Sequence, residues 1–290
     1  MEVIITLING LSLGAIYSMI ALGYTMVYGI AKMLNFAHGD IIMVGGYTVY
    51  VFFSMSGNPV IAIVSAVLMC VVLGVIVEKV AYRPLRGASP LAVLITAIGV
   101  SYLLQSLAQM IFGSAQKMVT IADLGAVTVG GVKIEVSALV TLAVSLVVMV
   151  LLSLFVKFNR IGRAMVAVSE DRGAAQLMGI NVNSIIAITF AIGSALAGLA
   201  AVFYLLKSPG MYSTFGAMPG IKAFTAAVIG GIGSITGALL GSILLGVIEC
   251  ICDAIPSVAP YKEAIEFSIL IIILLVRQTG ILGKKRREKV

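Results

Sequence analysis

The sequence predicts an all-α polytopic membrane protein with eight or nine transmembrane or partly re-entrant helices and a short external β-hairpin-like loop. Three observations support this fold class. Hydrophobic residues make up 61% of the 290 residues, whereas soluble globular chains have roughly 45–50% even with glycine counted. Charged residues make up only 11%, against a usual figure of about 25%. Long apolar runs recur along the whole chain, and lipid must cover the surface that water cannot.

The same composition excludes several classes of protein. Disordered chains combine low hydrophobicity with high charge, which is the reverse of what is seen here. The net charge of +7 does not predict nucleic-acid binding, because basic membrane proteins usually carry the excess in cytoplasmic loops. Three cysteines in or beside apolar runs and a single histidine give neither a disulfide framework nor metal-ligand spacing. We therefore expect no cofactor bound by this chain.

Nine apolar runs supply the predicted helices. A spanning helix needs about 20 apolar residues, with a range of about 17–25. The runs 41–55, 221–235 and 237–251 are shorter than that and are predicted to be tilted, re-entrant or half-helices, which leaves the count at eight or nine. The first run has no basic n-region and is too long for a signal sequence, so we expect it to be retained. The runs are 3–30, 41–55, 59–80, 90–112, 136–156, 185–206, 221–235, 237–251 and 264–276.

Basic residues predict the orientation. By the positive-inside rule, the loops that hold 14 of the 19 basic residues are cytoplasmic, and so is the C-terminus. Nine spans would place the N-terminus outside, and eight would place both termini inside. The remaining five basic residues are mixed with acidic ones in loops predicted to be external: Lys117, Lys133, Lys207, Lys222 and Lys262.

Two loops are long enough to form structure of their own. Residues 114–135 are predicted to be external and to form a β-hairpin with a Gly130-Gly131 turn, because β-branched residues flank the glycine pair. Residues 157–183 are predicted to be cytoplasmic and form the most polar long stretch of the chain.

The cytoplasmic loop is predicted to contain two short amphipathic helices. Ser169 would cap the second helix, Glu170 and Asp171 would lie in its first turn, and Gly179 would end it as a C-cap. An exposed helix joined to two spans is suited to receive force from a partner protein. An amphipathic anchor on the membrane surface is the alternative interpretation.

Glycine is abundant and permits two interpretations at each motif. The pairs Gly10/Gly14 and Gly237/Gly241 place small residues on one helix face, which favours close packing within the chain or a dimer seam. Four glycines in residues 230–237 interrupt an apolar stretch, as in a broken helix beside a transport pathway or in a tight turn.

Few ionisable residues lie in the apolar runs. Residues 35–40 hold the single histidine, His38, which together with Asp40 could serve a proton relay or ligand site. Alternatively, Asn35 or Asp40 caps the following helix. Glu249 lies deep in its run and would line a pathway or bind a coupling ion, unless it lies at the outer boundary near Asp253. This scarcity of carboxylates disfavours an ion-driven transporter.

Several motifs together resemble a known family. Ala174-Ala175-x-x-x-Gly179 resembles the loop by which permeases of bacterial ABC transporters dock on their ATPase. In their order and spacing, residues 14–23, 35–40, 160–179 and 230–237 resemble the permeases of branched-chain amino acid importers, the LivH type. Gly173 stands where the loop motif usually has glutamate, so the acidic residue that meets the ATPase is left open. The resemblance implies an ATPase-coupling loop with Arg163, Glu170, Asp171, Ala174, Ala175 and Gly179.

The resemblance also implies the partners and the activity. The chain would be a single transmembrane permease domain over residues 1–290 in a bacterial inner membrane, paired with a homologous second permease, two ATPase subunits and an extracytoplasmic binding protein. It has no phosphate-binding loop, so the ATPase partner would use ATP and Mg, and this chain is not an enzyme. It would move Leu, Ile or Val inward by alternating access. The alternatives are a permease for urea or short amides, and an ATP-independent facilitator. The possible pathway residues are Asn35, His38, Gly230, Gly231, Gly233, Gly237 and Glu249.

Overall fold

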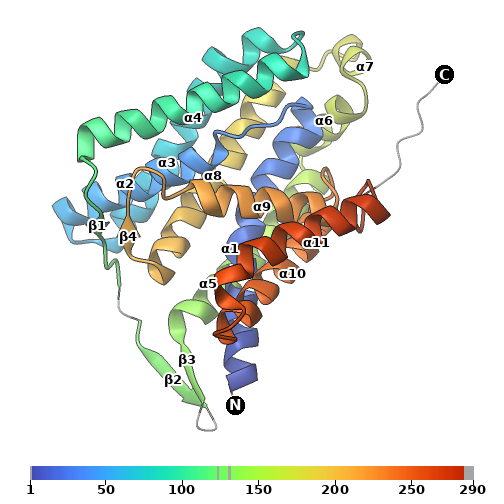
Figure 1. Ribbon diagram of the computed structural model, residues 1–290. Coiled ribbons are helices and arrows are strands. Elements are labelled where there is room, and N and C mark those ends of the chain that lie inside the picture. The colour runs from blue at the N-terminus through green and yellow to red at the C-terminus, as the bar shows by residue number, and fades with distance from the viewer. Residues whose placement is uncertain (1, 123, 130–131, 284–290) are drawn as a thin grey trace.

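Eleven α-helices make up most of the chain in the computed structural model, which describes residues 2–122, 124–129 and 132–283 (Figure 1). A π-helical turn at Glu78–Tyr82 and short 3-10 turns at Arg83–Leu85 and Ala259–Tyr261 extend or join them. The helices are α1 (Glu2–Ala31), α2 (His38–Ser56), α3 (Pro59–Val77), α4 (Pro90–Phe112), α5 (Val136–Phe158), α6 (Arg160–Glu170), α7 (Arg172–Leu177), α8 (Val182–Lys207), α9 (Ala217–Gly230), α10 (Ile235–Ala254) and α11 (Lys262–Val276).

Six of the described helices are long and apolar enough to cross a membrane, which confirms the all-α polytopic class. They are α1, α3 with its continuation to Leu85, α4, α5, α8 and α10. The count of eight or nine is not confirmed, because α2, α9 and α11 do not meet the same criteria of length and apolarity. The runs 41–55 and 221–235, which were predicted to be short, correspond to α2 and α9. The run 237–251, also predicted to be short, lies in α10, which is 20 residues long and qualifies as a span.

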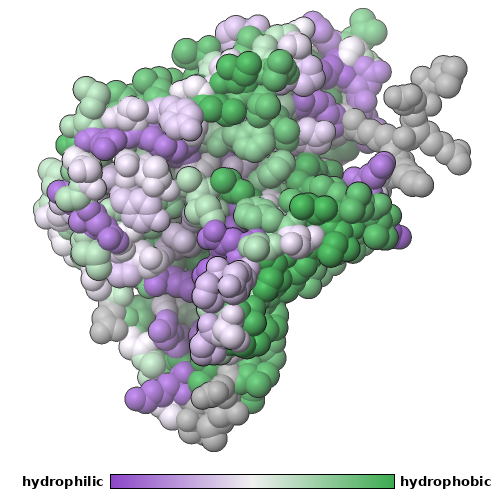
Figure 2. Space-filling view, in the orientation of Figure 1, coloured by the Kyte–Doolittle hydropathy of each residue, from purple (hydrophilic) through white to green (hydrophobic). Residues whose placement is uncertain are grey.

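Helices α1 and α8 form the centre of the bundle. Helix α1 packs along α10, α8, α5 and α9, and α8 packs along α3 and α2. Helices α4 and α5 instead bury few of their side chains, and many of their apolar residues are exposed. Figure 2 shows a further apolar surface over α11, where Ile271, Ile272, Leu275 and Val276 are exposed. Such surfaces suit contact with lipid or with other membrane helices.

The paired glycines serve packing inside the chain. A Cβ atom on Gly10 would lie 2.8 Å from the Cα of Val247, and one on Gly14 would lie 2.7 Å from the Cα of Ile243, both on α10. A Cβ atom on Gly241 would overlap the carbonyl oxygen of Ala226 on α9. The interpretation as close packing within the chain is therefore confirmed for these motifs.

The predicted hairpin is present as two antiparallel strands, β2 (Ala126–Val129) and β3 (Val132–Glu135), with Ala126 opposite Glu135. Its predicted turn, Gly130-Gly131, lies outside the described residues. A second small sheet pairs β1 (Lys117–Met118) with β4 (Gly210–Met211). The hairpin and the N-terminal end of α1 lie at one end of the bundle, and α6 and α7 lie at the opposite end (Figure 1).

The glycine-rich stretch forms a tight turn between α9 and α10. Gly231 and Gly233 have φ angles of 107° and 95°, which suit glycine. The Ser234 hydroxyl then accepts a hydrogen bond from the Gly237 amide at 3.1 Å and caps α10. A turn thus separates the two helices, and its relation to a transport pathway stays a prediction.

Candidate functional site

The α6–α7 segment, residues 159–181, is shaped by three side-chain caps. Asn159 accepts a hydrogen bond from the Ile161 amide at 2.9 Å, Asp171 from Ala174 at 3.0 Å and Asn181 from Ser184 at 3.1 Å. Each cap satisfies an amide group that the first turn of a helix leaves unpaired. The caps therefore begin α6, α7 and α8 in turn.

The prediction that Ser169 caps the second helix is wrong. Ser169 lies within α6, and its hydroxyl donates to the Val166 carbonyl at 2.7 Å. Because α6 continues to Glu170, the cap lies two residues later than predicted, at Asp171, which has an extended backbone and is the N-cap of α7. Glu170 was predicted to lie in the first turn of the second helix, but it is the last residue of α6.

Gly179 ends α7, as predicted. Its φ is 81°, its amide donates to the Gln176 carbonyl at 3.0 Å, and the Ile180 amide donates to the Ala175 carbonyl at 3.0 Å. This pair of bonds forms the C-terminal motif in which a left-handed residue, usually glycine, ends the helix.

The segment is fixed to the bundle along one face. Met165 and Val168 of α6 and Ala175 of α7 are buried. Gly162 packs directly on the backbone of α5, where a Cβ atom would overlap the Phe155 carbonyl oxygen. The Arg172 guanidinium donates to the carbonyl of Ala31 at the end of α1. The segment is therefore in direct contact with both α1 and α5.

The opposite face is exposed and ends in two apolar side chains that the sequence analysis missed. Leu177 is 90% exposed and Met178 is 82% exposed. Their position in the sequence could have indicated this, because two large apolar residues stand directly before the glycine that ends a short, otherwise polar helix. Of the predicted coupling residues, Ala175 is buried. The other five are exposed: Arg163, Glu170, Asp171, Ala174 and Gly179.

The predicted caps of α2 do not form. Its N-cap is Ala37, which provides no side-chain hydrogen bond. Asn35 instead accepts a hydrogen bond from the Tyr82 hydroxyl at 2.8 Å, and Asp40 accepts one from Gln105 on α4 at 2.8 Å. Partners from other helices thus engage both side chains. His38 is buried against Tyr24, with 4.7 Å between ring centroids, and its Nε2 has no partner among the described residues.

Glu249 belongs to a buried charge network that joins α1, α9, α10 and α11. Its carboxylate accepts hydrogen bonds from the Tyr17 hydroxyl at 2.7 Å and from Lys222 Nζ at 2.6 Å. Lys222 Nζ also lies 3.2 Å from Glu266. At the edge of this network, Lys262 lies 3.5 Å from Glu249 and 3.0 Å from Asp253. Glu249 is therefore both buried and close to the boundary residue Asp253.

The network corrects one element of the predicted topology. Lys222 was assigned to an external loop, but it lies in α9 and is only 4% exposed. A buried ammonium group is tolerated because two carboxylates offset its charge. Sequence position alone gave no sign of these partners, which lie on other helices.

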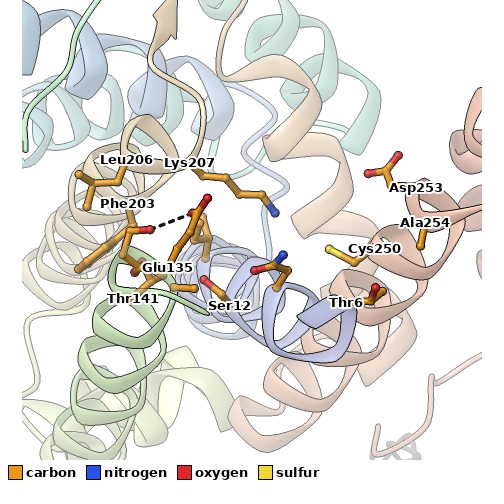
Figure 3. A pocket seen from close by; sticks show the side chains of 14 residues that line it. Thr6, Ser12, Glu135, Thr141, Phe203, Leu206, Lys207, Cys250, Asp253 and Ala254 are labelled. Atoms are coloured by element: carbon orange, nitrogen blue, oxygen red, sulfur yellow. Dashed lines mark hydrogen bonds between the residues drawn. The ribbon is translucent and has the colours of Figure 1, made fainter. Parts of the chain in front are cut away.

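A pocket of about 410 Å³ opens at the hairpin end between α1, α5, α8 and α10 (Figure 3). We call it the hairpin-end pocket; charged, hydroxyl and apolar side chains line it. None of the seven predicted pathway residues lines it, although Glu249 precedes the lining residue Cys250. The structure does not gather the seven into one site, and their role in a pathway stays a prediction.

The sequence matches the family described as the permease component of branched-chain amino acid transport systems over residues 6–274. The chain belongs to this family. It is 42% identical to the high-affinity branched-chain amino acid transport system permease protein BraD of Pseudomonas aeruginosa, over 98% of this chain and 97% of that protein. It is 40% identical to the corresponding permease LivH of Escherichia coli K12, over 97% and 96%.

A comparison with solved structures supports the fold alone. A metal-chelate-type ABC transporter in an inward-facing conformation superposes with a TM-score of 0.50 at 12% identity, covering 93% of this chain and 87% of that one. With the family established, this chain is a membrane-spanning permease subunit of an ABC transporter and not an enzyme, and separate subunits hydrolyse ATP. The resemblance to LivH-type permeases is thereby confirmed.

Proposed function

We propose that this chain is one of two permease subunits of an importer that moves branched-chain amino acids across a bacterial inner membrane into the cytoplasm. The observation that carries the proposal is identity of 42% and 40%, over nearly the full length, to permeases named for high-affinity transport of these solutes. A homologous second permease, two ATPase subunits and an extracytoplasmic binding protein complete the importer. The ATPase subunits bind ATP and Mg; this chain binds no cofactor.

The α6–α7 segment is the surface proposed to dock on the ATPase. A basic cluster that includes Lys32, Arg86 and Arg172 lies at the same end of the bundle, which favours the cytoplasmic side. Leu177 and Met178 project from this end and are the side chains we propose to enter a groove of the ATPase. The amide of Ile281 donates a hydrogen bond to the carbonyl of Ile229, near the end of α9. The turn that follows α9 lies next to Gly29, near the end of α1. This contact favours a cytoplasmic C-terminus.

The contacts of the α6–α7 segment supply a route for alternating access. It touches α5 through Gly162, touches α1 through Arg172, and continues directly into α8. These three helices also line the hairpin-end pocket. Closure of the ATPase dimer would thus tilt three of the four helices around that pocket.

Uptake by the purified system tests the transported solute. The chain is co-expressed with the second permease, the ATPase subunits and the binding protein encoded beside it, and the complex is placed in liposomes. We expect ATP-dependent uptake of leucine that isoleucine and valine inhibit and urea does not. Uptake of urea with no leucine uptake, or leucine flux that needs no ATP, would overturn the proposal.

The docking surface has its own test. Replacing both Leu177 and Met178 by aspartate removes the apolar contact. We expect the ATPase to bind at least tenfold more weakly, which is about 1.4 kcal/mol, so that ATPase co-purification and uptake are lost. Leu282→Asp is the control, because Leu282 is an exposed apolar residue near the same end. Normal ATPase recovery with the double variant would refute this docking surface.

A further inference from the structure

We propose that the hairpin-end pocket is an entry site that binds the charged head of an α-amino acid and its aliphatic side chain at once. This inference rests on the proposed function and extends it to named groups. The volume of about 410 Å³ lies within the range of small-molecule sites, roughly 300–1,000 Å³. The pocket's lining residue Glu135 ends β3 of the hairpin. The hairpin lies at the end opposite the α6–α7 segment (Figure 1), where an imported solute would arrive.

The rim of the pocket carries both signs of charge. Lys207, the last residue of α8, is exposed and forms no salt bridge within the part of the chain that the structure describes. Its ammonium group reaches into the space between Glu135 and Asp253 (Figure 3). Asp253 is paired with Lys262 at 3.0 Å, whereas Glu135 accepts, among the described residues, only a hydroxyl hydrogen bond, from Ser137 at 3.2 Å. Lys207 and Glu135 are thus the two charges left to meet a ligand.

These two charges match the ends of a zwitterion. The carboxylate of an amino acid would pair with Lys207, and its ammonium group would pair with Glu135. Such charge-assisted hydrogen bonds are about twice as strong as neutral ones. A neutral solute such as urea could hydrogen-bond to both groups but would form no ion pair with either, so the site favours a zwitterion over it.

The buried part of the lining combines hydroxyl groups with apolar side chains. Two buried hydroxyl residues line the pocket, Ser12 on α1 and Thr141 on α5. Thr141 donates to the Ser137 carbonyl at 2.7 Å, so its oxygen can still accept a hydrogen bond. Ile16, Phe203 and Leu206 supply the apolar part of the lining. A charged rim above apolar side chains fits an α-amino acid with a branched aliphatic side chain.

Cys250 provides a direct probe of occupancy because it lines the pocket, whereas Cys70 and Cys252 are buried. The permease–ATPase complex in nanodiscs is treated with a water-soluble maleimide, and Cys250→Ser identifies the label on this residue. Leucine is expected to slow labelling of Cys250. Leucinamide, which lacks the carboxylate, and 4-methylpentanoate, which lacks the amino group, should each protect at least tenfold less well.

Two variants assign the charges. Lys207→Gln should weaken protection by leucine about tenfold and leave protection by leucinamide unchanged, while Glu135→Gln should leave protection by 4-methylpentanoate unchanged. Lys133→Gln is the matched control, since Lys133 is an exposed lysine on β3, two residues before Glu135, and does not line the pocket. ATP-driven leucine uptake should fall with Lys207→Gln and not with Lys133→Gln.

Several outcomes would overturn the inference. They are an unreactive Cys250, equal protection by all three compounds, or equal effects of Lys207→Gln and Lys133→Gln. If the unsubstituted complex takes up leucine and any of these results is obtained, only the pocket assignment fails. If the complex does not take up leucine at all, the proposed function fails first.

Discussion

The α6–α7 segment and the buried charge network satisfy their polar groups in opposite ways. In the segment, Asn159, Asp171 and Asn181 each bond to an amide two or three positions further along the chain. In the network, Lys222 and Glu249 are 27 positions apart, and Tyr17 and Glu249 are 232 positions apart. The segment therefore holds its shape by local bonds, whereas the network exists only when four helices have assembled.

This difference between distant and local partners predicts which single substitutions lower stability the most. Removing one partner from a buried ion pair leaves the other charge unpaired in a medium that solvates it poorly. Losing a cap affects one helix end, where water can replace the lost bond. Variants in the two regions should thus differ in size and in the property they change.

The largest effect is expected for Lys222→Met. This variant leaves Glu249 and Glu266 without their shared ammonium group, which should lower the free energy of unfolding by about 3–5 kcal/mol. Denaturant titration of the purified complex measures the loss. Lys262→Met is the control, because its side chain is 29% exposed and such pairs contribute only about 0–1 kcal/mol. Equal stability of the two variants would show that the buried network is not stabilising.

A second variant separates packing from transport at the turn between α9 and α10. A Cβ atom on Gly230 would overlap the Gly237 carbonyl oxygen, so Gly230→Val should destabilise the subunit by about 1–3 kcal/mol through overpacking. On Gly29, the nearest heavy atom would lie 3.6 Å away, and Gly29→Ala should be tolerated. Thermal unfolding and complex recovery report the difference. A Gly230→Val complex that assembles normally but takes up no leucine would instead favour a pathway role for this glycine.

The same distinction between local and distant partners explains what the sequence could predict. The run 90–112 matches α4 at both ends, because Ser89 caps the helix, Pro90 suits its first position and Gly113 follows its end. The hairpin and the Gly179 cap were equally readable from neighbouring residues. The burial of Lys222 was not, since its two carboxylate partners lie on other helices.

The candidate sites follow the same division. The α6–α7 segment was located from its motif, although Ser169 was given the role that Asp171 has. The hairpin-end pocket could not be predicted, because its lining comes from α1, β3, α5, α8 and α10. No window of sequence places Lys207 beside Glu135.

A smaller and more local effect is expected at Gly179. Its left-handed backbone disfavours a β-branched residue by roughly 1–2 kcal/mol, so Gly179→Val should misplace Leu177 and Met178 and reduce uptake without preventing membrane insertion. Gly179→Asn should retain most of the uptake, since asparagine tolerates this conformation. Gly173→Ala is the control, because Gly173 lies within α7 and has no positive φ. Full uptake by Gly179→Val would contradict the link between the cap and coupling.

The smallest effect is expected at Asp171, where capping and charge can be separated. Asp171→Ala removes the bond to the Ala174 amide and should destabilise α7 by about 1 kcal/mol. Asp171→Asn keeps an acceptor of the same shape and removes only the charge. Uptake that falls with alanine and survives with asparagine would assign Asp171 to the shape of the segment. Equal loss in both variants would show that the ATPase requires the carboxylate, which would settle the role left open by Gly173.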